Sequence, residues 1–322
     1  MKVTRIRCLN RVSKGSTLYS GDVKVLFLAR FILKGQSQAA LVTASMAILG
    51  LIVPPAAWIS AASIVLVTLV HGPQRGLITT ALSLLGALIF AYLIFAMPQV
   101  AVIFVLLVWL PAWIIATILR QTVSMAFSLQ ILTLISLLAV VLFYTLFPDF
   151  GEYWRESLDH MVAQLVQQSD EFSVTELQRT EDLIIDFLPG LFVSSIMFGT
   201  MISLFLGRWW QAVFYNPGGF AKEFHSLNLG KISALIALAI TFIAVIVNNV
   251  FAFALVTVVF VLYLAQGLSI LHAAVKMRQI NAAWLFVVYI IMFFIPHLLL
   301  LLVVVGMIDP WLEMRQRIRP AS

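Results

Sequence analysis

The segment RWWQAVFYNPGGFAKEFHSLNLGK, residues 208–231, lies between two long apolar runs, residues 183–207 and 232–250. An apolar run of about 20 residues is long enough to cross a bilayer as a helix. The same alternation of apolar runs and short polar segments continues along most of the chain, which is 62% hydrophobic and 11% charged. Soluble domains carry about 25% charged residues, so a soluble fold could not bury this much apolar surface. The sequence therefore predicts an all-α polytopic transmembrane helical bundle in contact with a lipid bilayer.

Nine transmembrane spans are predicted, five within residues 36–147 and four within residues 187–307. The first two apolar runs are short, and Pro54 and Pro55 separate them. A proline lacks the N–H that a helix interior needs, and it disfavours the helical conformation in the residue before it. A tight hairpin of two helices is therefore expected in place of one kinked helix of roughly 32 residues, which would be too long for a bilayer even when tilted.

Charge asymmetry predicts the orientation of the chain. Residues 1–35 carry eight basic residues and one acidic residue, and loops rich in Lys and Arg stay on the cytoplasmic side. We therefore expect a multi-pass protein of a bacterial cytoplasmic (inner) membrane. Its N-terminal segment, which includes a short interfacial helix, and its 208–231 segment face the cytoplasm. This orientation accounts for the net charge of +6, so no nucleic-acid partner is predicted.

The orientation of the basic C-terminal tail, residues 308–322, is left open. Nine spans that start from a cytoplasmic N terminus place this tail outside, yet it carries Arg315, Arg317 and Arg319. If Pro296 divides the last apolar run into a re-entrant pair, the chain has eight full spans and the tail is cytoplasmic.

Residues 148–186 form a distinct acidic segment. They hold ten of the chain's 14 acidic residues and only two Lys or Arg residues, which is typical of a segment outside the cytoplasm. Apolar side chains from Trp154 to Val166 recur at helical spacing, so amphipathic extracytoplasmic helices are predicted here. The acids lack the spacing of a calcium-binding loop, and no metal site is predicted.

Sequence motifs of several common enzyme classes are absent. There is no phosphate-binding G-x-x-x-x-G-K-[ST] loop, no H-E-x-x-H zinc motif and no G-x-S-x-G nucleophile turn. The single cysteine, Cys8, cannot form a disulfide within the chain. We therefore expect a protein that is not an enzyme and that needs no cofactor.

The 208–231 segment is the predicted interaction site on the cytoplasmic side. Phe220, Phe224 and Leu227 recur at helical spacing, so they would form one apolar stripe suited to lipid or to a partner groove. Glu223 and His225 are two residues apart and do not share a helix face, so an acid–base pair is not favoured. The residues predicted for partner docking or interfacial contact are Trp209, Trp210, Phe220, Glu223, Phe224, His225 and Leu227.

Polar residues within the apolar runs form a second candidate site. Polar side chains are costly in hydrocarbon, so those that occur there are candidates for function. Gln266, His272 and His297 are the strongest of these. His272 lies close to the end of a span, and His297 follows Pro296, which frees a backbone carbonyl four residues earlier. Structural roles therefore remain open for both histidines.

A family resemblance rests on several short stretches: FILKGQSQAAL at 31–41, LVTLVHGPQRGL at 66–77, PGGF at 217–220, EFHSL at 223–227 and GMIDPW at 306–311. Through these stretches, residues 27–317 resemble the YybS-like family of uncharacterised bacterial membrane proteins. That family is distantly similar to the S components of energy-coupling-factor transporters, which the turn with Gly72, Arg75 and Gly76 also resembles. The resemblance implies a fold that binds a small solute and works beside a separate ATP-driven module. The chain departs from a plain S component by its larger number of spans and its acidic segment.

Two functions follow as hypotheses. The first is a non-enzymatic solute-binding transport subunit, whose partner is an ATP-driven module and which should hold a closed polar cavity among its spans. The alternative is a membrane scaffold or accessory protein that docks other proteins through residues 208–231.

Overall fold

The structure is a computed structural model, and it describes residues 20–155, 159 and 174–318. These residues form helices and, among them, no strand, which confirms the predicted all-α class. The chain divides into two compact units, and each is described by itself. The first unit comprises Met1–Ser128 and Gly199–Phe224, and the second comprises Leu129–Phe198 and His225–Ser322.

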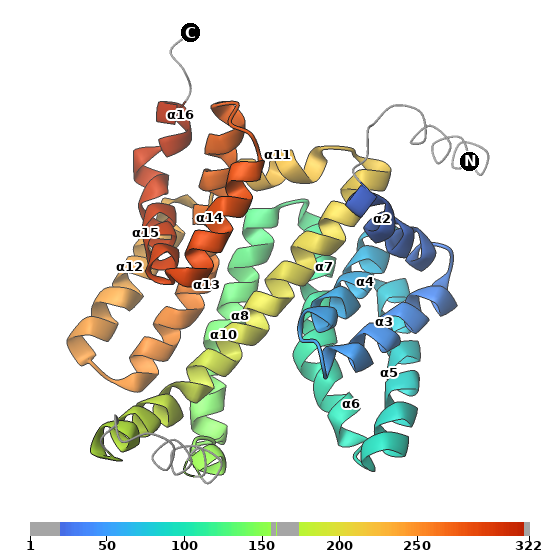
Figure 1. Ribbon diagram of the computed structural model, residues 1–322, viewed down its shortest axis with the longest axis horizontal. Helices are drawn as coiled ribbons and strands as arrows, with labels where there is room; N and C mark the ends of the chain where they lie inside the picture. The colour runs from blue at the N-terminus through green and yellow to red at the C-terminus, as the bar shows by residue number, and fades with distance from the viewer. Residues whose placement is uncertain (1–19, 156–158, 160–173, 319–322) are drawn as a thin grey trace. The chain divides into compact units, whose positions relative to one another are not determined.

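The first unit is built from helices that follow one another closely along the chain (Figure 1). The end of α10 and the short α11 complete it. Its elements are α2 (Ser20–Ile32), α3 (Gln36–Gly50), α4 (Pro55–His71), α5 (Pro73–Phe95), α6 (Gln99–Phe104), the π-helical turn η2 (Val105–Trp109), α7 (Leu110–Thr122), α10 (Val174–Tyr215) and α11 (Gly219–His225).

Proline and glycine determine the turns on either side of α4. Both α4 and α5 begin with a proline, Pro55 and Pro73, at a position where a backbone N–H would have no helical partner. Gly72, between them, has a φ of 100°, which residues with a side chain rarely adopt. Because α3 ends at Gly50 and α4 starts at Pro55, the chain forms two separate helices here, as predicted.

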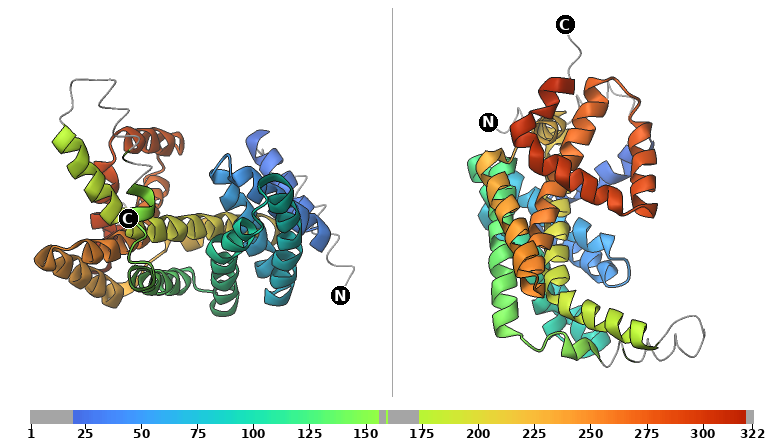
Figure 2. Two further views of the ribbon diagram at one scale, coloured as in Figure 1. Left: turned by 90° about the horizontal axis from the view of Figure 1, so that it is seen from below. Right: turned by 90° about the vertical axis from the view of Figure 1, so that its left-hand side faces the viewer.

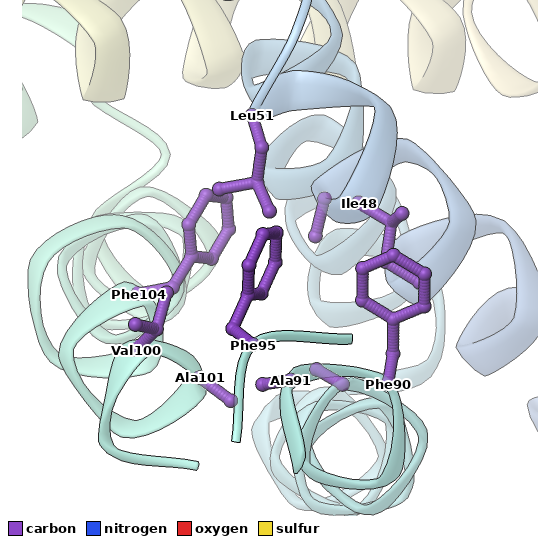
Figure 3. Close-up of a pocket in the computed structure, with 10 residues that line it drawn as sticks. Ile48, Leu51, Phe90, Ala91, Phe95, Val100, Ala101 and Phe104 are labelled. Carbon is purple, nitrogen blue, oxygen red and sulfur yellow. The ribbon is translucent and has the colours of Figure 1, made fainter. Parts of the chain in front are cut away.

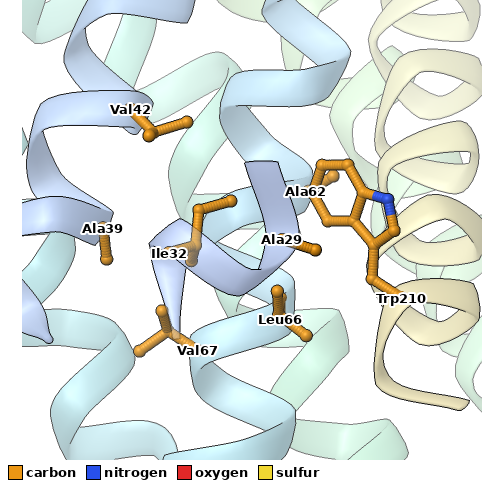
Figure 4. Packing of buried hydrophobic residues seen from close by; sticks show 8 residues of the cluster. All are labelled: Ala29, Ile32, Ala39, Val42, Ala62, Leu66, Val67 and Trp210. Carbon is orange, nitrogen blue, oxygen red and sulfur yellow. The ribbon is translucent and has the colours of Figure 1, made fainter. Parts of the chain in front are cut away.

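Helix α4 lies at the centre of the first unit, where side chains from α2, α3 and α10 pack against it (Figure 4). Trp210, which is 1% exposed, belongs to this cluster. The predicted span ends at Gly207, but α10 continues to Tyr215 and carries Trp210 into the core. The buried members of the cluster are Ala29, Ile32, Ala39, Val42, Ala62, Leu66, Val67 and Trp210.

The second unit is built around α13. Of the most apolar 18-residue stretch of α13, 56% is buried, whereas only 17% of the corresponding stretch of α12 is buried. Asn248, with a φ of 49°, forms the turn between them, and the Asn249 side chain caps α13 by accepting a hydrogen bond from the N–H of Ala252 at 2.8 Å. Besides the first part of α10, the unit contains α8 (Met125–Leu146), α12 (Gly230–Val247), α13 (Val250–Met277), α14 (Ala283–Phe294), α15 (His297–Leu312) and α16 (Met314–Ile318).

Two glycines allow α13 and α15 to approach closely. A Cβ atom on Gly267 would clash with the backbone carbonyl of Leu302, and one on Gly306 would clash with that of Tyr263. Small residues at such a crossing are typical of helices that pack within a bilayer.

Six helices in the described part of the chain are long and apolar enough to cross a membrane, and α14 with α15 would add a seventh if the pair is one span. That pair is bent by 116° at its break (Figures 1 and 2). The predicted first and second spans correspond to α3 and α4, which have only 15 and 17 residues. The prediction of nine spans is therefore not confirmed. The six are Pro73–Phe95, Gln99–Thr122, Met125–Leu146, Thr180–Tyr215, Gly230–Val247 and Val250–Met277.

The predicted amphipathic segment is described only in part. Most of the pattern from Trp154 to Val166 lies outside the described residues. Near its start, Arg155 pairs with Glu152 at 2.8 Å and with Asp182 at 2.9 Å. From Val174 onward α10 runs without interruption into the predicted sixth span.

Candidate functional site

Three polar residues lie on one face of α13 in the second unit. Tyr263, Gln266 and Ser269 are three residues apart, a spacing that places side chains on the same side of a helix. All three are fully buried. A buried polar group is stable only when it has hydrogen-bond partners, so the surroundings of each residue indicate what this face does.

Gln266, one of the predicted intramembrane residues, connects two segments of the second unit. Its Oε1 accepts a hydrogen bond from the backbone N–H of Leu229 at 3.0 Å, and its Nε2 donates to Oδ2 of Asp309 at 3.2 Å. Leu229 directly precedes α12, and Asp309 belongs to the last turn of α15. The amide therefore joins the beginning of one helix to the end of another.

Arg315 and Asp309 extend this network. The guanidinium donates to Oδ2 of Asp309 at 2.7 Å, to the carbonyl of Leu227 at 2.7 Å and to Oγ of Ser269 at 2.8 Å. Oδ1 of Asp309 accepts from the backbone N–H of Met314 at 3.1 Å. Asp309 is 2% exposed, so its charge is balanced within the protein and not by water.

The chain reversal after α15 makes this pairing geometrically feasible. Glu313, with a φ of 48°, ends α15 in the left-handed conformation, and α16 begins at the next residue. Arg315 thereby returns to Asp309, six residues earlier. We call Gln266, Ser269, Asp309 and Arg315 the buried polar network. It anchors the polypeptide between α11 and α12, where Leu227 and Leu229 are also buried.

A cavity of about 210 Å³ lies between α8, α12 and α13. Tyr263, in its wall, is a neighbour of the buried polar network along α13. The wall is mainly aliphatic and includes four polar side chains. Its lining residues are Gln130, Thr133, Leu134, Leu137, Ser233, Ile236, Ala237, Ile240, Val259, Leu262 and Tyr263.

Three of the four polar side chains of this cavity have partners within the protein, whereas Tyr263 has none among the residues that the structure describes. Nε2 of Gln130 donates to the carbonyl of Leu229 at 2.8 Å and to Oγ of Ser233 at 2.7 Å. Thr133 Oγ1 donates to the carbonyl of Leu129 at 2.9 Å. The hydroxyl of Tyr263 is buried and has no hydrogen-bond partner among the described residues. Among the polar side chains that line the cavity, Tyr263 is thus the one whose hydroxyl is without a partner in the described part of the chain.

The first unit contains a much smaller hollow between α3, α5 and α6 (Figure 3). Its volume is about 30 Å³, and the side chains that line it, such as Ile48, Phe95 and Phe104, are all apolar. It offers no polar side chain with which to select a solute. Neither of these two hollows is the closed polar cavity expected of a solute-binding subunit, because the walls of both are mainly apolar.

The two predicted histidines His225 and His272 come together in the second unit. Their ring centroids are 6.2 Å apart, and Nε2 of His272 lies 2.6 Å from the hydroxyl of Tyr289. Burial lowers the pKa of His225, and the positive charges of Lys276 and Arg315 lower it further. The third predicted histidine, His297, is exposed at the first residue of α15.

The 208–231 segment is more buried than its sequence predicts. Glu223 forms an ion pair with Arg208, in which the guanidinium Nε lies 3.0 Å from Oε2. Phe224 is buried and stacks on Phe220 with ring centroids 5.8 Å apart, and both rings also contact Phe205.

The predicted apolar stripe is therefore packed against the protein over much of its length. Leu227 is also buried and belongs to the other unit, while Trp209 is half-buried. Tyr215, the turn at 216–218 and Lys222 remain exposed. Glu223 pairs with Arg208, and the His225 ring lies near that of His272.

Sequence reasoning identified Gln266 but did not identify Asp309, Arg315, Gln130 or Tyr263. Asp309 carried a usable signal, because it is an acidic residue at the end of a long apolar run. The others carried none, since their importance comes from contacts between distant helices.

A model of a protein family, described as "Predicted membrane protein (DUF2232)", matches residues 40–310. No curated protein and no solved structure matches the chain.

Proposed function

Because the chain belongs to the DUF2232 family of predicted membrane proteins, we propose that it acts within a membrane as a non-enzymatic, solute-binding subunit of a transport system. The observation that carries this proposal is the cavity of about 210 Å³ in the second unit, whose wall includes Tyr263, a residue with a hydroxyl that has no partner among the described residues. A concave, mostly apolar space with few polar groups is the usual form of a site for small molecules.

The pairing of the buried ionic groups supports binding in preference to catalysis. Asp309 is held by a guanidinium, an amide and a backbone N–H, so its oxygens are already occupied. A general base has to be within reach of the proton that it takes up, and this carboxylate is buried and already bonded through both oxygens. In the second unit the buried polar network therefore acts as a structural connection and not as an acid–base pair.

The same network supports a partner-driven mechanism. It links the polypeptide at Leu227 and Leu229 to α13, and α13 also provides Tyr263 to the cavity. A separate ATP-driven module that moved this polypeptide would therefore act on a wall of the cavity. This is the arrangement expected of a protein similar to an S component, set in a bacterial cytoplasmic membrane with its N terminus inside.

A scaffold that docks proteins through residues 208–231 receives support only from the exposed part of that segment. Tyr215, the turn at 216–218 and Lys222 are accessible, whereas Phe224 and Leu227 are not. A docking surface on this segment would have to be small and polar.

Native mass spectrometry of the gently solubilised protein tests the proposed function. We expect the protein to retain a small molecule, and we expect Ala237→Leu, which places a larger side chain in the cavity wall, to lose it. Leu238→Phe is the matched control, because Leu238 lies outside the lining and is exposed. Retention of a partner protein without any small molecule would favour the scaffold, and the recovery of neither under several growth conditions would contradict both functions.

A further inference from the structure

We infer that the cavity between α8, α12 and α13 binds an uncharged, single-chain amphiphile that enters from the bilayer, with the Tyr263 hydroxyl bonded to its polar group. This inference rests on the proposed solute-binding function and deepens it by naming the class of ligand.

The size of the cavity limits what it can hold. Its volume of about 210 Å³ exceeds the ~150 Å³ of an engineered apolar cavity that binds benzene. It is smaller than the roughly 300–1,000 Å³ of a pocket that encloses a drug-sized molecule. The cavity therefore accommodates one narrow hydrocarbon chain or small ring, while the rest of a longer molecule stays outside.

The cavity is polar at one end and apolar at the other. Gln130 and Ser233 lie within the first two turns of α8 and α12, while Leu137 and Ile240 lie about two turns further along the same helices. A molecule with a polar group at one end of a hydrocarbon chain matches this distribution.

Helix α13 runs antiparallel to α12, so its polar residue in the cavity wall comes after its apolar residue along the chain. It follows α12 after a tight turn, and it reaches Val259 before Tyr263. Its polar group therefore lies towards the end of the cavity where α8 and α12 begin. All three walls thus place their polar side chains at that end.

Two side chains at the edge of the cavity show where a ligand would enter. Leu134 on α8 is 62% exposed and Ile236 on α12 is 55% exposed, although both line the cavity. Both helices belong to the set that is apolar enough to cross a membrane. The opening between them therefore faces lipid hydrocarbon, and a molecule dissolved in the bilayer reaches it without passing through water.

The lining also indicates that the polar group of the ligand is uncharged. The polar side chains in the wall are an amide and three hydroxyls, and no lysine, arginine, aspartate or glutamate in the described part of the chain lines the cavity. An ion placed there would lose its hydration without gaining a counter-charge, which is costly. A hydroxyl or carbonyl group needs only one hydrogen bond, and the Tyr263 hydroxyl, which has no partner among the described residues, is the group we assign to it.

Photochemical labelling in vesicles tests the inference. The full chain is reconstituted in phosphatidylethanolamine and phosphatidylglycerol and exposed to a long-chain alcohol that carries a diazirine in its chain. We expect saturable labelling of α8, α12 and α13 at cavity residues such as Leu137, Ile240 and Val259. We also expect Tyr263→Phe, which removes only the hydroxyl, to weaken binding about three- to tenfold.

Two controls give the experiment its specificity. Tyr289→Phe removes a tyrosine hydroxyl that contacts His272 outside the cavity, so it should leave labelling unchanged. The ionised fatty acid of the same chain length should label the cavity several-fold less than the alcohol, because the wall has no cation to pair with it.

The outcomes separate this inference from the proposed function. Labelling that is spread evenly over lipid-facing helices, that prefers the fatty acid or that is unaffected by Tyr263→Phe overturns the amphiphile site. If the solubilised protein still retains another solute that Ala237→Leu removes, the solute-binding function stands without it.

Discussion

The carboxylate of Asp309 is an ionised group in an apolar setting, and its stability depends on one side chain. It is 2% exposed, and Arg315 supplies the opposite charge at 2.7 Å. Burial lowers the pKa of Arg315, and the charge and hydrogen bond of Asp309 oppose that shift. Each group therefore needs the other, because removal of one partner leaves a buried charge without compensation.

Asp309→Asn should reduce the free energy of unfolding by about 3 kcal/mol, since it leaves the Arg315 guanidinium largely buried and unpaired. Glu313→Gln is the matched control, because Glu313 is an exposed acid four residues away, and its effect should stay within about 0.5 kcal/mol. The measurement is denaturation of both variants in detergent. If Asp309→Asn and Arg315→Gln have additive effects in the double variant, the pair contributes no coupling and the assignment is wrong.

His225 should make stability depend on pH. Its pKa in the fold lies below the ordinary value of 6.5, so the unfolded chain binds a proton first as the pH falls. The stability that neutral His225 provides is present above pH 6.5 and is lost as the pH decreases through the lowered pKa. We expect the unfolding temperature to fall between about pH 7 and pH 5.

The replacement His225→Gln should flatten this pH dependence, while Ser226→Ala at the next position should leave it intact. An equal slope in wild type and His225→Gln would assign the effect to another group. Burial is the main cause of the lowered pKa of His225, and the nearby Lys276, His272 and Arg315 lower it further, so these three groups should be retained in all variants.

At the scale of helices, the sequence predicted where α10 lies along the chain better than the residue at which it ends. The predicted sixth span stops at Gly207 because Arg208 is charged, yet α10 continues to Tyr215. A charged side chain does not interrupt backbone hydrogen bonds, and Arg208 is paired with Glu223, whereas the following Asn-Pro-Gly-Gly sequence does end the helix. The position of Trp210 in the core follows from this continuation and could not be derived from a rule that ends spans at charged residues.

The crossing of α13 and α15 should be intolerant of a methyl group. Gly267→Ala would push a Cβ into the Leu302 carbonyl, and we expect it to cost about 1–3 kcal/mol of stability. Gly86→Ala in α5 is the control, because the nearest atom to its added Cβ, the Cβ of Ala44, lies at an ordinary 3.5 Å. In that helix the change should be neutral or stabilising by about 0.5–1 kcal/mol. Equal losses from both variants would show that the crossing is looser than described.

At the scale of the whole molecule, the buried polar network bears on the number of spans. Arg315 bonds to the carbonyl of Leu227, so the polypeptide before α12 and the end of α15 lie at the same end of the second unit. Between these two points, α12 and α13 form an antiparallel pair, so the end of α13 lies on the same side as the start of α12. The bent pair α14–α15 should therefore also return to its starting side, which favours a re-entrant pair over one further span at this end of the chain.

A topology experiment checks this consequence. A reporter inserted in the exposed turn at 216–218 and a reporter fused after Ser322 should both be active in the cytoplasm. A periplasmic signal from the second reporter, with a cytoplasmic signal from the first, would restore the prediction of nine spans. The two short helices α3 and α4 are tested in the same way by a reporter in the turn between them.

The all-α class could be predicted because lipid solubility is a property of composition and run length alone. The pairing of Gln266 with Asp309 could not, because the two residues are 43 positions apart and belong to different helices. The same holds for Tyr263, whose hydroxyl looks ordinary in a sequence and is distinguished only by what surrounds it. Periodicity identifies which face of a helix is polar, and only the packed structure identifies the partner.

The position of Gln266 in the chain imposes an order on biosynthesis. When α13 leaves the ribosome, Leu229 has already been made, but Asp309 follows 43 residues later. Translation at ~5–20 residues per second leaves a delay of roughly 2–9 s. During that interval the amide can bond to Leu229 but not to Asp309, so one half of its hydrogen bonding is missing. We therefore expect the second unit to depend on the membrane-insertion machinery until its last helices have been synthesised.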